Sequence, residues 1–325
     1  FKQKTAYEIG VRLVGSEMCI RDRLGNPYCY RDSRTSGVME RVFEVVSADE
    51  IFSQTGVQFM EFNSLFQWIA WKQSGSPLVD CAQHLLMIPD LLHWLMTGEK
   101  VVEQTNASTT QCYNPLTGDW ATELLERFQL PTEILCPIVP PGTRLGPLRP
   151  HVSATTGLGD IDVVLPGTHD TASAVMAVPA KASNEETWCF ISSGTWSLMG
   201  VEIPQPIINQ SCRQLNFTNE GGVGGTTRLL KNIMGLWLVQ ECRHIWNAAG
   251  KEVDWDTLTH IAEQATPHAA IIDPNDLRFL KPDNMPATIQ EYCGETSQPI
   301  PDSPGAIIRC ALAVSYTHLT LPTKA

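Results

Sequence analysis

The sequence lacks the cysteine spacing of a metal site or of a disulfide framework. Its ten cysteines are scattered over 325 residues, with no Cys-x-x-Cys pair and no paired spacing with histidine. We therefore expect free thiols in a reducing cytoplasm rather than a secreted, disulfide-bonded protein.

Long apolar runs and an excess of basic residues are also missing. No apolar segment approaches the length that a membrane-spanning helix needs. The 35 acidic and 23 basic residues give a formal net charge of −12. Such a charge disfavours nucleic acids and anionic membranes as partners. We expect small-molecule partners, and an anionic one would need backbone N–H groups or a metal ion to bind here.

A Walker-type phosphate loop, Gly-x-x-x-x-Gly-Lys-Ser/Thr, is absent as well. The glycine-rich segment 219–225 (NEGGVGG) follows no predicted strand, so it does not match a dinucleotide-binding fingerprint either. We interpret it as a loop.

The two ends of the chain differ in character from the rest. Residues 1–23 and 314–325 look like translated sequencing-adapter DNA, and residues 1–23 lack the apolar core of a signal peptide. We exclude both ends from the fold prediction. The remaining fragment is predicted to form two partial domains, 24–180 and 181–313, with the boundary in the polar stretch 179–186.

Helix signals dominate the first half of that fragment. Ser47 and Glu50 form a capping box for a short helix that ends near Gly56. Ser76-Pro77 begins another helix, and Gly98 ends the helix that is predicted from Pro89 to Met96. Further helices are predicted from the cap Asn63 to Trp71, from Ala121 to Phe128 and from Trp255 to Ala265.

One short loop combines a carboxylate with a predicted strand end. The apolar run 161–165 predicts a strand covered on both faces, and Gly167-Thr168-His169-Asp170 follows it. A helix is predicted from Asp170 to Val178, and ligands collect at such strand ends in α/β proteins. Asp170 is therefore a candidate general base, although a helix N-cap is the more common use of aspartate here.

A second loop, Ser192-Ser193-Gly194-Thr195, lies between the segments 188–191 and 196–201, which predict a hairpin. Backbone N–H groups at such a turn can face a phosphate, but ordinary hairpins use the same residues. Helical periodicity over 228–246 would place Asn232 and Gln240 on one face, toward a nucleotide or toward solvent.

Taken together, these segments resemble the FGGY family of carbohydrate kinases. The resemblance covers residues 24–313 in the right order, through motifs that are far more specific jointly than singly. They are YRDSRT at 30–35, TNAST at 105–109, GTHDTASAV at 167–175, ISSGTWSLMG at 191–200, NFTNEGG at 216–222 and LKNIMGLW at 230–237.

The resemblance implies an α/β protein of the actin/hexokinase-like (ribonuclease H-like) ATPase fold, with two domains that are both truncated here. It implies Asp170 as the proton acceptor in phosphoryl transfer from ATP. The other implied roles are His169 and Thr171 beside the sugar, Thr195, Asn232 and Gln240 beside ATP, and Mg²⁺ bridging the ATP phosphates.

GTHD together with SSGTWSLMG favours L-rhamnulose as the ketose, phosphorylated at O1 in bacterial rhamnose catabolism, over L-fuculose or xylulose. The family's opening Asp-x-Gly phosphate loop and closing adenosine loop are missing from the chain, so we expect residues 24–313 to be inactive by themselves. Two other hypotheses stay open: a non-catalytic sugar-binding relative, and a hydrolase with His169 and Asp170 around a metal ion.

Overall fold

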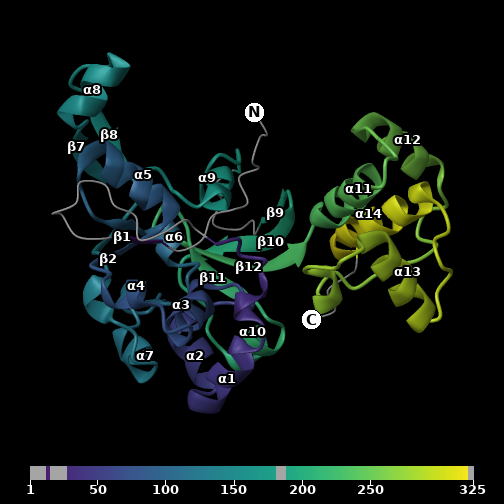
Figure 1. The fold of residues 1–325 in the computed structure, drawn as a ribbon, viewed down its shortest axis with the longest axis horizontal. Coiled ribbons are helices and arrows are strands. Elements are labelled where there is room, and N and C mark those ends of the chain that lie inside the picture. The colour runs from purple at the N-terminus through teal and green to yellow at the C-terminus, as the bar shows by residue number, and fades with distance from the viewer. Residues whose placement is uncertain (1–11, 15–27, 181–187, 321–325) are drawn as a thin grey trace. The chain divides into compact units, whose positions relative to one another are not determined.

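The computed structural model of the chain describes residues 12–14, 28–180 and 188–320, and of 12–14 and 314–320 the backbone only. The chain divides into two compact units, drawn as a ribbon in Figure 1. Unit 1 comprises Phe1–Phe190 and Gly200–Lys231, and unit 2 comprises Ile191–Met199 and Asn232–Ala325. Of the predicted boundary stretch 179–186, residues 181–186 lie outside the described residues. The structure groups Gly200–Lys231 with the first unit.

The helices of unit 1 begin and end largely where the capping residues predict. The hydroxyl of Ser47 accepts the Glu50 N–H over 3.2 Å, and Gly56 ends the same helix with φ +63°. Gly98 ends a later helix with φ +96°. The helices are α1 (Val38–Val45), α2 (Ala48–Thr55), α3 (Ser64–Gln73), α4 (Pro77–Asp80), α5 (Ile88–Thr97), α6 (Gln104–Ala107), α7 (Thr122–Arg127), α8 (Pro150–Thr156), α9 (Asp170–Met176) and α10 (Gln210–Gln214).

One predicted cap differs in detail. Asn63 does precede α3, but its side-chain amide donates to the Gln58 carbonyl and to the Gln111 side chain instead of capping the helix. The buried faces of α1, α2, α3, α5 and α7 enclose the core of unit 1, whereas α8 and α10 have no buried residues. The most buried members of this core are Ile51, Leu65, Phe66, Leu86, Val102, Ala107, Leu124 and Leu125.

A four-stranded sheet has the strand order β11-β12-β10-β9. Its strands are β9 (Cys189–Ser193), β10 (Trp196–Ile203), β11 (Thr218–Gly221) and β12 (Thr227–Met234). The predicted hairpin over 188–201 is confirmed. The predicted helix over 228–246 is wrong in its first part, because β12 is bonded to a strand on each side and the helix begins only at Trp237. The predicted loop 219–225 is also partly strand.

The apolar run 161–165 does not form the buried strand that was predicted. Among the described residues, strand β8 (Asp162–Val164) pairs only with β7 (Arg144–Pro147), and Ile161 and Val164 are 45% and 53% exposed. An apolar run does not by itself reveal how many strands and helices cover it. The other short strands are β1 (Arg12–Val14) with β2 (His84–Leu86), β3 (Val102–Glu103) with β6 (Ile138–Val139), and β4 (Tyr113–Asn114) with β5 (Asp119–Trp120).

Unit 2 places four helices after the strand segments. They are α11 (Trp237–Ala248), α12 (Trp255–Gln264), α13 (Met285–Glu295) and α14 (Pro304–Thr320). Helix α12 matches its prediction, while α14 and β1 extend into the end segments that were excluded. Leu238, Cys242, Met285 and Ile289 are fully buried. Among the described residues, no helix has both the length and the apolar character that a bilayer span requires.

Candidate active site

The GTHD loop, residues 167–170, joins β8 to α9 in unit 1. Gly167 is buried, and a Cβ atom there would lie 2.6 Å from Val223 Cγ2 and 3.3 Å from Ser173 Oγ, so the position has no room for a side chain. Helix α9 begins at Asp170, as predicted. The loop is therefore held tightly at its start and delivers its carboxylate at a helix N-terminus, a favourable place for negative charge.

Asp170 is exposed, and its Oδ1 accepts the Thr171 N–H over 2.6 Å and the Thr171 hydroxyl over 3.3 Å. Thr171 itself is only 4% exposed. The structure thus brings these two predicted site residues together, with Thr171 fixing the orientation of the carboxylate. Oδ2 receives neither of these bonds. An oriented carboxylate open to solvent is a suitable proton acceptor.

The Nδ1 atom of the His169 ring faces the guanidinium group of Arg228. This atom lies 3.3 Å from Arg228 Nη2 and 4.0 Å from Glu220 Oε2. A guanidinium group can only donate, so Nδ1 is the acceptor and Nε2 carries the hydrogen. Burial lowers the pKa of His169, and the Arg228 charge lowers it further against the opposing effect of Glu220. The ring is therefore neutral near pH 7 and offers an Nε2–H donor.

Arg228 and Glu220 were not predicted as site residues. They face each other directly across the β11–β12 pair, with Nη2 and Oε2 3.1 Å apart, and Arg228 Nε donates to the Gly221 carbonyl over 2.9 Å. Arg228 is fully buried. Helical periodicity placed residue 228 in a helix, and this pair across two strands was therefore not predicted. The glycine-rich turn between acidic Glu220 and basic Arg228 was the signal that could have indicated it.

We expect Arg228 to set the protonation of His169. Arg228→Met removes the positive charge that lowers the pKa of His169 and leaves the Glu220 side chain in place, so the pKa of His169 should rise and the ring should protonate at higher pH. Imidazole ¹⁵N resonances of the 325-residue chain, followed against pH, measure this directly.

The double variant Arg228→Met/Glu220→Gln is the control, since it removes both charges and should return the His169 pKa below its ordinary value. An unchanged His169 titration in Arg228→Met would contradict the assigned contact.

Thr168 is anchored by a residue that sequence reasoning also missed. Its backbone N–H and its hydroxyl both donate to Glu103 Oε2, over 2.9 and 2.8 Å. Glu103 ends β3 and is fully buried. It directly precedes the TNAST motif, but only the folded chain shows that it reaches a loop 65 residues away.

A second buried acid lies behind Glu103. Asp90, in the first turn of α5, accepts the Glu103 N–H on Oδ1 over 3.0 Å and is 1% exposed. Burial, helped by the nearby Glu103 carboxylate, raises the pKa of Asp90 to about 7. The Asp90 carboxyl is therefore largely protonated in the folded protein at mildly acidic pH.

This shifted pKa predicts a pH-dependent stability. Between about pH 4 and 7 the Asp90 carboxyl is ionised in the unfolded chain but stays protonated in the folded chain. The free energy of unfolding therefore falls as the pH rises, by up to about 1.4 kcal/mol per pH unit. The variant Asp90→Asn carries an amide at this position, which does not titrate. Urea unfolding of both proteins across this range should show the stability of wild type falling relative to Asp90→Asn, and a pH-independent difference would contradict the shift.

In unit 2 the predicted turn is bonded to the start of α11. Carbonyl oxygens of Gly194 and Thr195 accept N–H groups from Leu236 (2.9 Å), Gly235 (3.1 Å) and Trp237 (3.2 Å). The Thr195 hydroxyl donates to Gln240 Oε1 over 3.3 Å. These bonds fix the turn against the first turn of the helix.

The predicted ATP-side residues are therefore only partly on one element. Thr195 and Gln240 are hydrogen-bonded to each other, but Asn232 lies on β12, whereas the prediction put it on one helix with Gln240. Strand β12 carries Asn232, and Gly235 directly follows that strand. The eight-residue spacing between Asn232 and Gln240 therefore does not place the two side chains on one face of a helix. All three side chains are polar and uncharged.

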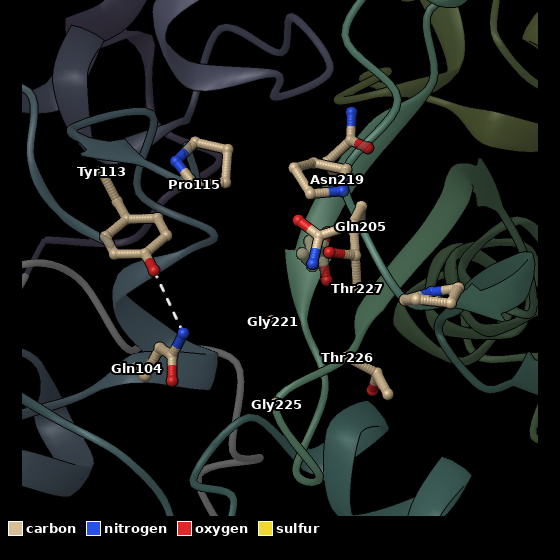
Figure 2. Close-up of a pocket in the computed structure, with 12 residues that line it drawn as sticks. Gln104, Tyr113, Pro115, Gln205, Asn219, Gly221, Gly225, Thr226 and Thr227 are labelled. Atoms are coloured by element: carbon tan, nitrogen blue, oxygen red, sulfur yellow. Dashed lines mark hydrogen bonds between the residues drawn. The ribbon is translucent and has the colours of Figure 1, made fainter. Parts of the chain in front are cut away.

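A polar pocket in unit 1 adjoins the partners of His169. It encloses about 420 Å³ of empty space, including the part open to solvent, and Glu220 and Gly221 are in its lining. Figure 2 shows Gln104 and Tyr113 on one side, joined by a 3.1 Å hydrogen bond, and Gln205, Asn219, Thr226 and Thr227 on the other. Amide and hydroxyl groups of this kind suit a small polyhydroxy compound.

Metal-ligand clusters do not occur in the described part of the chain: no three His, Cys, Asp or Glu side chains gather there. The hypothesis of a hydrolase built on His169 and Asp170 around a protein-held metal thus gains no support from the described residues.

Comparison with known proteins identifies the family. Residues 20–177 match the N-terminal domain of the FGGY family of carbohydrate kinases, and residues 189–315 match its C-terminal domain. The chain belongs to the FGGY family of carbohydrate kinases. As an FGGY protein it has the two-domain actin/hexokinase-like α/β fold that the motifs implied.

Two curated relatives of this FGGY chain are named rhamnulokinase. The Oceanobacillus iheyensis protein is 44% identical over 297 residues, covering 90% of this chain and 61% of that protein. The Bacteroides thetaiotaomicron protein is 41% identical over 318 residues, covering 96% and 64%. The chain therefore spans somewhat more than three-fifths of these relatives.

A solved structure agrees at the level of fold. The ligand-bound xylulose kinase from Lactobacillus acidophilus has a TM-score of 0.64 at 19% identity, covering 80% of this chain and 51% of that one.

Proposed function

We propose that this protein is an ATP-dependent kinase that converts L-rhamnulose to L-rhamnulose 1-phosphate. The observation that carries the proposal is the exposed, oriented Asp170 carboxylate next to a neutral His169, within the segment 20–177 that matches the N-terminal domain of a family of sugar kinases. The choice of ketose is supported by relatives named rhamnulokinase at 41–44% identity.

In the proposed reaction, the sugar's O1 attacks the γ-phosphorus of ATP while Asp170 accepts the O1 proton, and ADP leaves. The Nε2–H of His169 donates a hydrogen bond to a sugar oxygen, since its other nitrogen is occupied by Arg228. Thr171 keeps the carboxylate aimed, through the two bonds that it donates to Oδ1.

The nucleotide is assigned to unit 2. We propose that the turn at Gly194-Thr195 binds phosphate and that Asn232 and Gln240 contact the nucleotide. These three side chains are uncharged, so they can hydrogen-bond ATP but cannot balance its charge. Mg²⁺ entering with ATP would supply that balance at the phosphate oxygens. We further propose a cytoplasmic location, because the nine described cysteines are all unpaired.

Substrate choice can be tested in a chimera, since the chain spans 61% of its Oceanobacillus relative. In the chimera, residues 24–313 replace the matching segment of that relative. Initial rates with ATP and L-rhamnulose, L-fuculose or D-xylulose give kcat/KM for each ketose. We expect L-rhamnulose to be preferred by at least about tenfold, as differences in hydroxyl contacts allow. Equal or better use of another ketose would overturn the assignment.

A further inference from the structure

Glu103 has an unusual environment for a carboxylate. It is fully buried, yet the structure gives it no lysine or arginine partner among the described residues. Its charge is met by four donors from two threonines. Thr105 N–H donates to Oε1 over 2.8 Å, and the Thr105 hydroxyl, the Thr168 N–H and the Thr168 hydroxyl donate to Oε2 over 2.5, 2.9 and 2.8 Å.

Those bonds converge on the GTHD loop. Thr168 is held by Glu103 directly, and the next N–H, that of His169, donates to Thr105 Oγ1 over 3.2 Å. Thr105 is itself held by Glu103. Two consecutive peptide groups immediately before Asp170 therefore depend on one buried carboxylate.

The Asp170 side chain is exposed, and it is oriented by the two bonds that its neighbour Thr171 donates to Oδ1. Asp170 is the first residue of α9 and directly follows the two residues that Glu103 and Thr105 hold. The position of the carboxylate consequently follows the backbone of residues 168–169. A proton acceptor must lie within about 2.6–3.2 Å of the proton's donor atom, and displacement by about 1 Å can cost about 100-fold in rate.

We propose that Glu103 is a positioning residue that anchors the GTHD loop and so sets the reach of Asp170 toward the sugar hydroxyl. The inference rests on the proposed function for its effect on rate. It requires a carboxylate at 103: in Glu103→Gln the side chain keeps its size, but an amide NH₂ replaces one acceptor and meets donors. The rearranged loop then carries Asp170 away from its working position.

The test is a double-mutant cycle in the chimera. We expect Glu103→Gln to lower kcat by about 10- to 100-fold with KM for ATP unchanged. On the Asp170→Asn background the same substitution should cost almost nothing, because the group through which Glu103 acts is already gone. Equal losses on both backgrounds would mean general structural damage and overturn the inference.

Thr168 supplies a second, milder test. Thr168→Val removes one hydroxyl donor and should lower kcat, whereas Thr168→Ser keeps the hydroxyl and should retain it. Glu123→Gln, an exposed glutamate on α7, is the control and should match wild type. Full kcat in both Glu103→Gln and Thr168→Val would contradict the inference.

Hydrogen exchange in the 325-residue chain separates this inference from the proposed function. Glu103→Gln should speed exchange of the Thr168 and His169 amides by at least about tenfold without affecting the Leu125 amide, which donates to the carbonyl of Ala121, the residue before α7. Unchanged exchange overturns the anchoring. A wild-type chimera that phosphorylates no ketose, with exchange still accelerated, would refute the proposed function alone.

Discussion

Replacing Asp170 with asparagine is expected to lower kcat for L-rhamnulose phosphorylation in the chimera by about 10²- to 10⁴-fold. Asparagine keeps the shape and an oxygen that can accept the Thr171 N–H, which donates over 2.6 Å. It cannot take up the proton of the attacking hydroxyl. Since binding contacts are preserved, KM for both substrates should change little. Steady-state kinetics with varied ATP and varied ketose measure both quantities.

A matched carboxylate is available as the control. Asp256 is also an exposed aspartate in the first turn of a helix, α12 of unit 2, and has no part in the proposed reaction. Asp256→Asn should leave kcat at the wild-type value. If Asp170→Asn kept wild-type kcat as well, Asp170 would be only an acidic residue in the first turn of α9.

Gly235→Ala should weaken ATP binding in unit 2 and destabilise that unit. A Cβ atom at 235 would lie 2.6 Å from Ser197 Oγ, 2.7 Å from the Gly194 carbonyl oxygen and 2.9 Å from Ser197 N. Two of these atoms are backbone, so the turn carrying Thr195 must move. Overpacking of this kind costs about 1–3 kcal/mol. We expect a lower thermal midpoint and about tenfold weaker ATP binding by calorimetry.

Gly224→Ala provides the comparison, because no atom lies within 4 Å of its added Cβ. It should leave the thermal midpoint and ATP binding unchanged. A Gly235→Ala chain as stable as Gly224→Ala would show that the 235 backbone does not approach the turn as described.

Local sequence signals predicted the helices well, because their causes are local. Ser47 with Glu50 fixes the start of α2, and Gly56 and Gly98 fix two ends through left-handed backbone. The hairpin over 188–201 and the start of α9 at Asp170 followed from equally short patterns. Each of these features depends on residues that are close together in the sequence.

The errors have a common physical origin in long-range pairing. Residues 228–234 have helical periodicity, but hydrogen bonds to strands on both sides make them β12. Within the described part of the chain, the apolar run 161–165 has only one strand partner, and its Ile161 and Val164 are exposed. Secondary structure that depends on distant partners cannot be read from periodicity alone.

The site residues also divide into those that a short sequence motif indicates and those that only long-range contacts reveal. Asp170, His169 and Thr195 stand out by motif, whereas Glu103 and Arg228 gain their importance only from contacts with residues 65 and 59 positions away. A charged residue in sequence suggests a solvent-exposed position, and both of these are fully buried. Their partners became visible only in the folded chain.

The central claim is that one carboxylate on the GTHD loop takes the proton from O1 of L-rhamnulose as ATP phosphorylates that oxygen. Phosphorus NMR of the chimera with ATP and L-rhamnulose labelled with ¹³C at C1 tests it most directly. The account predicts a C1–phosphorus coupling that grows with wild type and does not develop over the same time with Asp170→Asn. Phosphate bonded at another carbon, or equal product formation by both proteins, would contradict it.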